Sequence, residues 1–186
     1  WMVTDKTGKA IVIEKTKEGF KVYENKVGVM TNAPSFDWHI TNLRQYMNAT
    51  PVQPTSANWS DLELTPLGSA TGGIGLPGDF SSPSRFVRVA FLRAQILMED
   101  IENDGIIEFF HILNNVAMVK GSVITKDGKD EITQYSSCMN LEKGLYYYKS
   151  YNNNQINMLD MHKEDLDGSE MKIFPYNDVQ VVNLLN

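Results

Sequence analysis

Three glycines near the middle of the chain have a spacing that could bind phosphate groups. Gly73, Gly75 and Gly78 match G-x-G-x-x-G, the loop that holds the pyrophosphate of a dinucleotide. That chemistry needs a buried strand before the loop and a helix directly after it, so that free backbone N–H groups face the phosphates. Here the preceding residues, LTPLGSATG, have no strand pattern, and Pro77 removes one N–H group. The glycines are therefore interpreted as turn residues rather than as a nucleotide site.

Histidine and cysteine, the usual metal ligands and nucleophiles, are few and scattered. His39, His111 and His162 lie far apart, and none falls in a metal-ligand spacing such as H-E-x-x-H. The acidic residues of 160–167 lack the regular spacing and central glycine of a calcium loop. Cys138 lies in a strand-like segment, where a small core residue is the ordinary interpretation. No metal or other cofactor is expected.

Two further side chains have the chemistry to stabilise a developing negative charge. Asn32, in MTNAP, carries a neutral amide that can donate to an oxyanion, although the residue alone favours a role in capping or turning the chain before Pro34. Arg85, in SPSRF, brings a positive charge to the first turn of a predicted helix, where a cation opposes the helix dipole. An exposed or ion-paired arginine is the alternative there. Residue type alone leaves both questions open.

Composition excludes several classes of partner. The 186 residues are 42% hydrophobic and 22% charged, which is typical of one globular domain. A formal net charge of -6 without a dense Lys/Arg cluster argues against binding to nucleic acid. Arg88 and Arg93 interrupt the longest apolar-rich run, so no segment reaches the roughly 18 to 20 apolar residues of a membrane span. We therefore expect neither a nucleic-acid nor a membrane partner.

The elements before Asn32 and around Arg85 follow from the hydrophobic period. Strands separated by glycine-containing turns are predicted over residues 2–4, 10–15 and 20–24. Apolar residues at helical spacing then predict a helix that starts near Ser35 or Asp37 and ends before Pro51. Asn32 is thus expected just before this helix.

The later part of the chain is predicted to hold a loop, two helices and more strands. Residues 50–84 read as a long loop, whose Trp59, Leu62, Leu64 and Leu67 should pack on the surface. Helices are predicted over Pro83 to Asp100, with Ser82 as N-cap, and over Gly105 to Asn115. The predicted strands are 121–125, 131–139, 145–151, 155–160 and 171–174. Alternation along a strand should place Tyr147 on the face opposite Tyr146 and Tyr148.

Three long segments, taken in order, resemble the choloylglycine hydrolase family, which contains penicillin V acylases and conjugated bile salt hydrolases. They are VGVMTNAPSFDWHITNLRQY (27–46), LPGDFSSPSRFVRVAF (76–91), and ITQYSSCMN followed by YYYKSYNNNQI (132–140 and 146–156). The resemblance spans essentially the whole chain. It implies the α+β fold of an N-terminal-nucleophile (Ntn) hydrolase, a four-layer αββα sandwich, and cleavage of a linear amide bond.

The resemblance also implies roles for the two candidate residues. Asn32 matches the asparagine that looks placed to steady the tetrahedral intermediate, and Arg85 matches the arginine close to the nucleophile. The nucleophile of such enzymes is an N-terminal cysteine whose own α-amine takes part in proton transfer. Residue 1 here is Trp, and Cys138 is no substitute. We therefore expect residues 1–186 to be the C-terminal portion of a single Ntn-hydrolase domain, with the N-terminal part absent.

Two functional interpretations remain open. The first is a hydrolase of linear amide C–N bonds, acting on penicillin V or conjugated bile salts, that is inactive and unstable without its N-terminal segment. The second is a noncatalytic binding or scaffold module derived from the same fold. Residues 35–46 look more similar to the penicillin acylase branch. The resemblance further suggests a homotetramer in the cytoplasm.

Overall fold

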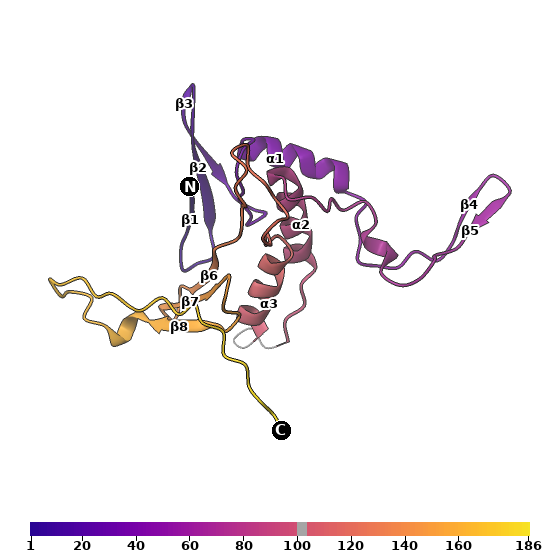
Figure 1. Cartoon of the computed structure of the whole chain (residues 1–186). Coiled ribbons are helices and arrows are strands. Elements are labelled where there is room, and N and C mark those ends of the chain that lie inside the picture. Colours follow the sequence, from indigo (N-terminus) through magenta and orange to yellow (C-terminus); the bar gives the residue numbers. More distant parts are fainter. Residues whose placement is uncertain (100–103) are drawn as a thin grey trace. The chain divides into compact units, whose positions relative to one another are not determined.

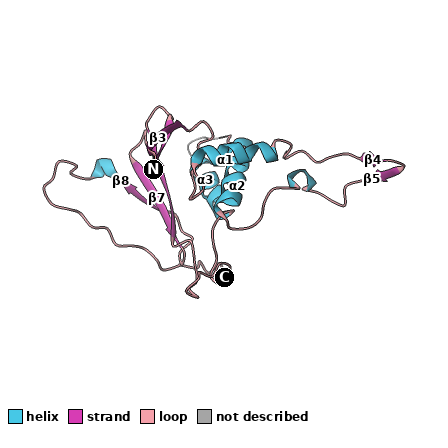
Figure 2. Ribbon diagram, turned by 90° about the horizontal axis from the view of Figure 1, so that it is seen from above, coloured by secondary structure: helices cyan, strands magenta, loops and turns pink. Residues whose placement is uncertain are grey.

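The structure, a computed structural model, describes residues 1–99 and 104–186 (Figure 1). Contacts divide the chain into two compact units. Unit 1 comprises Trp1–Thr4 and Lys9–Leu97, and unit 2 comprises Asp5–Gly8 and Met98–Asn186. Each unit contains both helix and sheet, as Figure 2 shows, which confirms the expected mixture of elements.

Unit 1 begins with a three-stranded antiparallel sheet, close to the predicted strands. Its strands are β1 (Met2–Thr4), β2 (Ala10–Thr16) and β3 (Gly19–Glu24), in the order β1-β2-β3. Val12 of β2 is fully buried while its neighbour Ile11 is exposed, because successive side chains point to opposite faces. This buried face is where the helices of unit 1 pack.

Two helices complete the core of unit 1. Helix α1 (Phe36–Asn42) continues as the 3-10 helix η1 (Leu43–Tyr46), so the predicted helix before Pro51 is confirmed. Helix α2 (Ser82–Gln95) contacts α1 through Phe36 and Phe86, whose ring centroids lie 6.3 Å apart. The core consists of Val12, Val29, Phe36, Phe86 and Ala90.

The start of α2 was predicted within one residue, but its predicted end was wrong. Its N-cap is Ser81 rather than Ser82, and the helix ends at Gln95 instead of reaching Asp100, which lies outside the described residues. The apolar stripe of the predicted helix was expected to end at Leu97 or Met98, but these side chains are 88% and 43% exposed. Helical turns that bury no apolar surface gain little from packing, which is why the pattern overestimated the length.

The segment between α1 and α2 is not entirely irregular. It contains a hairpin of β4 (Ala57–Trp59) and β5 (Leu62–Leu64), followed by the 3-10 helix η2 (Thr71–Gly73). The prediction that its large apolar side chains pack on the surface was wrong: Trp59 is 74% exposed, and Leu62, Leu64 and Leu67 are exposed too. The hairpin extends away from the helices of its unit in both ribbon views (Figures 1 and 2).

Unit 2 contains one α-helix and a three-stranded antiparallel sheet. Helix α3 (Asp104–Asn114) lies one residue from its predicted range. The strands are β6 (Tyr135–Asn140), β7 (Leu145–Ser150) and β8 (Asn157–Asp160), in the order β6-β7-β8, with the 3-10 helix η3 (Met161–Lys163) after them. Tyr147 is buried, whereas Tyr148 stacks on Tyr176 at the opposite face, as alternation predicted.

Two predicted strands of unit 2 did not form. Residues 121–125 contain only an isolated bridge between Ile124 and Asp130, and residues 171–174 have no strand. Ile124, Met171 and Ile173 are all exposed, so neither segment has a packed face to stabilise pairing. Within residues 1–99 and 104–186, none of the helices is both long and apolar enough for a bilayer.

Candidate active site

Asn32 and Arg85, 53 positions apart, form a direct hydrogen bond in unit 1. Arg85 Nη2 donates to Asn32 Oδ1 at 2.8 Å, and Arg85 Nε donates to the Phe80 carbonyl at 3.0 Å. A guanidinium can only donate, so the amide oxygen of Asn32 must face it, and this chemistry fixes which way the amide points. Among the described residues, Asn32 Nδ2 has no hydrogen-bond partner. The amide N–H groups are therefore available to a ligand.

A tight turn that is anchored in the core leads the chain to Asn32. The buried side chain of Asn25 accepts from Gly28 N at 2.8 Å and donates to the Val29 carbonyl at 3.1 Å. Gly28 has φ +66°, and a Cβ added there would lie 2.5 Å from Arg93 Cζ. Only glycine adopts this conformation without displacing the arginine. The backbone before Asn32 is thus held by packing and by hydrogen bonds.

The backbone carbonyl of Asn32 is also held, by donors from both helices of unit 1. Ser82 Oγ donates to it at 2.9 Å from the start of α2. His39 Nε2 lies 2.9 Å from the same oxygen and comes from α1. The Thr31 hydroxyl lies 2.9 Å from Ser82 Oγ and 3.2 Å from His39 Nε2. Asn32 is solvent-exposed, yet both its side chain and its backbone are fixed by groups on helices.

Asp79 organises the start of α2, where Arg85 lies. Its carboxylate accepts from Ser81 N at 2.8 Å and from Ser84 Oγ at 2.6 Å. The hydroxyls of Ser81 and Ser84, together with the Ser81 N–H, hold the pKa of Asp79 well below its ordinary value. A carboxylate at a helix N-terminus also interacts favourably with the dipole, which offsets the unfavourable position of Arg85. Arg88 Nη1 donates to the carbonyls of Pro77 and Asp79 at 2.8 and 2.7 Å and so holds the preceding loop.

Sequence reasoning identified Asn32 and Arg85 but missed the residues that support them. Asp79 lies two residues before the N-cap Ser81, outside the first turn in which acidic residues are enriched, so the helix-start pattern alone did not identify it. His39 gave no signal of this role either. Its position on the predicted helix after Asn32 indicated packing, and the structure confirms burial but adds the contact with Asn32.

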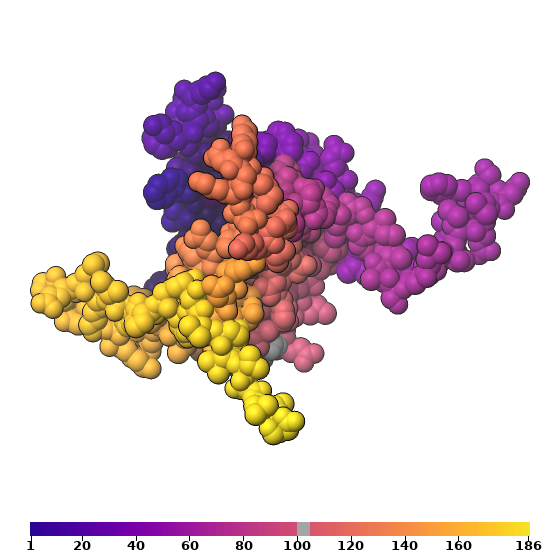
Figure 3. Space-filling view, in the orientation of Figure 1, coloured from indigo at the N-terminus to yellow at the C-terminus, as the bar shows by residue number. Residues whose placement is uncertain are grey.

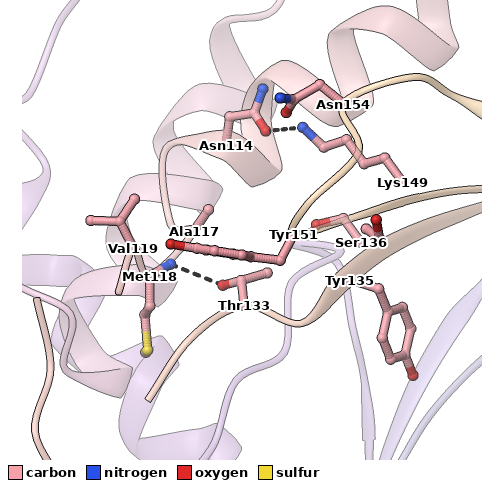
Figure 4. A pocket seen from close by; sticks show the side chains of 11 residues that line it. Asn114, Ala117, Met118, Val119, Thr133, Tyr135, Ser136, Lys149, Tyr151 and Asn154 are labelled. Atoms are coloured by element: carbon pink, nitrogen blue, oxygen red, sulfur yellow. Dashed lines mark hydrogen bonds between the residues drawn. The ribbon is translucent and has the colours of Figure 1, made fainter. Parts of the chain in front are cut away.

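Concave and reactive features also occur away from Asn32 and Arg85. In unit 1, a pocket of about 280 Å³ is lined by residues of the β4–β5 hairpin and of the segment that leads to η2. The features described next lie in unit 2. A pocket of about 340 Å³ is lined by residues of α3, β6 and β7, where Lys149 donates to Asn114 (Figure 4). Burial lowers the pKa of Lys149. Burial raises the pKa of the Cys138 thiol, which disfavours the reactive thiolate and agrees with a structural role. Neither feature contains a nucleophile paired with a base.

The chain belongs to the choloylglycine hydrolase family of linear amide C-N hydrolases, whose family model matches residues 1–174. The resemblance predicted from three segments is thereby confirmed. The chain is 54% identical over all 186 residues to a bile salt hydrolase/transferase from Clostridium perfringens and covers 56% of that protein. It is 44% identical over 175 residues to a bile salt hydrolase/transferase from Lactiplantibacillus plantarum and covers 54% of it. The chain thus spans about half the length of these relatives.

Solved structures agree with this assignment. The crystal structure of a mutant conjugated bile acid hydrolase from Clostridium perfringens matches with a TM-score of 0.91 and 54% identity, over 100% of this chain and 56% of that one. A penicillin V acylase from Agrobacterium tumefaciens matches with a TM-score of 0.63 and 21% identity, over 84% of this chain and 43% of that one. The second match shows a shared fold alone.

Proposed function

We propose that this chain is part of an enzyme that hydrolyses the linear amide bond of conjugated bile salts, with Asn32 and Arg85 in its active site. The observation that carries the proposal is the 2.8 Å hydrogen bond from Arg85 to Asn32 Oδ1, which leaves the amide N–H groups of Asn32 available. Attack on an amide carbonyl creates an oxyanion, and a preoriented neutral donor stabilises it with little reorganisation. The chain belongs to a family of hydrolases that perform this type of reaction.

Each residue has a distinct role in this proposal. Asn32 Nδ2 donates to the oxyanion of the tetrahedral intermediate. Arg85 orients the Asn32 amide and adds a positive charge that favours the developing negative charge. The nucleophile is a cysteine at the N-terminus of a segment that this chain does not contain, since Cys138 is the only cysteine here. Residues 1–186 would then be the C-terminal portion of one four-layer αββα domain, which is incomplete without that segment.

The comparisons favour bile salts over penicillin V as substrates. Relatives named as bile salt hydrolases reach 54% identity, whereas the penicillin V acylase structure reaches 21%. These values weigh against the preference for the acylase branch that residues 35–46 suggested. Penicillin V is kept as the alternative substrate. We also propose that the complete protein is a cytoplasmic homotetramer, as the family resemblance suggests. The rival function is that of a noncatalytic binding or scaffold module.

A hybrid protein tests the proposal. It joins residues 1–186 to the N-terminal segment of the Clostridium perfringens relative that this chain does not match, with the relative's terminal cysteine free. The hybrid should release glycine and taurine from conjugated bile salts, and the unfused chain should not. Replacing Asn32→Ala in the hybrid should lower kcat about 100-fold, since losing one oxyanion donor costs about 3 kcal/mol.

Asn58→Ala, on the exposed β4–β5 hairpin, is the matched control and should leave kcat unchanged. A folded hybrid that cleaves neither bile salts nor penicillin V would overturn the proposal and favour the scaffold. Full activity of Asn32→Ala would remove Asn32 from the site. Cleavage of penicillin V alone would reverse the substrate assignment.

A further inference from the structure

His39 is placed to hold Asn32 in position, although it lies too deep to reach a substrate. The side chain is 1% exposed and belongs to α1, the helix that begins four residues after Asn32. Its ring stacks on Phe86 of α2, with centroids 4.7 Å apart and planes 12° apart. Nε2 lies 2.9 Å from the Asn32 backbone oxygen. One side of the ring is therefore packed in the core while one edge contacts the candidate site.

The hydrogen-bond chemistry identifies the tautomer of this histidine. A carbonyl oxygen only accepts, so Nε2 must carry the proton that it donates to Asn32. In the neutral form of the ring, Nδ1 then carries no proton. Within the part of the chain that the structure describes, Nδ1 is buried and has no hydrogen-bond partner. A buried acceptor without a partner destabilises the folded state.

Packing alone therefore does not account for a histidine at this position. An aliphatic side chain of similar volume would fill the space between α1 and α2 and would leave no buried polar atom without a partner. What histidine adds is the Nε2–H group directed at Asn32. Together with Ser82 it saturates both lone pairs of the Asn32 carbonyl, one donor coming from each helix.

We propose that His39 is a positioning residue, which keeps Asn32 in the geometry needed to donate to the oxyanion. The inference rests on the proposed function, because it concerns the oxyanion role of Asn32. An oxyanion donor works only when it is already at the right distance and angle, within about 0.5 Å and 10 to 20°. Arg85 fixes the rotation of the Asn32 amide, and His39 and Ser82 fix the backbone that carries it.

Two variants of the hybrid separate positioning from stability. His39→Gln keeps an N–H donor of similar reach but loses the aromatic stacking on Phe86. His39→Leu keeps an apolar side chain in the core and removes the unpaired Nδ1, but has no donor for Asn32. His39→Leu should match or exceed the Tm of His39→Gln. Its kcat should nevertheless be lower than wild type by about 10-fold or more, with KM within about twofold, while His39→Gln keeps kcat within about threefold.

The opposite orders of Tm and kcat are the signature of a positioning role. If kcat followed Tm, with His39→Leu at least as active as His39→Gln, the proposal would be overturned. His111→Leu, the same substitution at an exposed histidine of α3, is the matched control and should leave kcat and Tm close to wild type.

A second measurement decides the matter even if one variant folds poorly. Because His39 acts through Asn32, adding His39→Gln or His39→Leu to Asn32→Ala should lower kcat no further, and an additive loss would contradict the proposal.

A wild-type hybrid that folds but does not hydrolyse bile salts overturns the proposed function instead. In that case, NMR of the Asn32 side-chain amide tests the role of His39. The amide should be ordered in the wild type and in His39→Gln, and mobile in His39→Leu. Equal order in all three would overturn it.

Discussion

Arg85 matters for its geometry as well as for its charge. Its guanidinium makes two hydrogen bonds in different directions, to Asn32 Oδ1 and to the Phe80 carbonyl. A planar group with donors on several nitrogens can join a loop carbonyl to a distant side chain, whereas a lysine ammonium is a single point at the end of a flexible chain. The two cations are therefore not interchangeable here.

Replacing Arg85→Lys in the hybrid should lower kcat/KM by about 10-fold or more, equivalent to roughly 1.4 kcal/mol or more of transition-state stabilisation. The positive charge is kept, so the loss measures the orientation of Asn32. Steady-state kinetics with a taurine-conjugated bile salt checks it, and Arg44→Lys, at an exposed arginine of η1, is the control. Activity of Arg85→Lys equal to that of Arg44→Lys would show that charge alone suffices.

At this scale the sequence predicted which residues to examine but not how they meet. Asn32 and Arg85 stood out through their resemblance to a family, since a lone asparagine before Pro34 is better explained as a turn residue. Their hydrogen bond depends on the packing of α1 against α2. The contact of His39 with Asn32 depends on the path of the chain around Pro34, which no helical period encodes.

Elements were predicted best where local chemistry defines them. The start of α2 was predicted within one residue, because serine and proline are favoured at the first positions of a helix. The turn glycines of the first sheet likewise placed β2 and β3 correctly. Predictions failed where apolar residues stay exposed, as at Leu97, Ile124 and Ile173. A hydrophobic pattern assumes that a face will be covered, and these side chains are not.

The start of α2 should give stability that depends on pH. The pKa of Asp79 is held below its ordinary value by the hydroxyls of Ser81 and Ser84 and by the Ser81 N–H. An aspartate whose pKa is lower in the folded state than in the unfolded chain stabilises the fold at pH values above its unfolded-state pKa, which is near 3.9. This stabilisation is lost as the pH falls through the folded-state pKa. Wild-type hybrid should therefore exceed Asp79→Asn in free energy of unfolding at neutral pH, and the difference should shrink below about pH 4.

Urea unfolding of both proteins between neutral pH and pH 3 measures this difference. Ser84→Ala removes one of the hydrogen-bond donors to Asp79. In this background, the difference in free energy of unfolding between Asp and Asn at position 79 should depend less on pH. A difference that stays constant over the whole pH range would mean that the Asp79 carboxylate does not contribute through its charge.

For the whole molecule, the important feature is the amount of apolar surface left uncovered. The core of unit 1 is small, while large side chains at the hairpin and in the C-terminal segment face solvent, with Val182 at 85% and Leu185 at 95% exposure. Both regions project from their own units in the space-filling view (Figure 3). The outer strands β1 and β3 also each have one edge without a strand partner in the described sheet. Exposed apolar patches and open edges of this kind favour association.

The isolated chain should therefore not behave as a stable domain. We predict a broad, noncooperative thermal transition and strong binding of the dye ANS, because a folded core of this size does not offset the conformational entropy of 186 residues. The hybrid, in which the N-terminal segment covers the open surfaces, should melt in one sharp transition and bind little dye. Calorimetry and ANS fluorescence on the two proteins at equal concentration test both statements. One cooperative transition for the isolated chain, without dye binding, would show that residues 1–186 are a complete folding unit and that the single-domain assignment with a separate N-terminal segment is wrong.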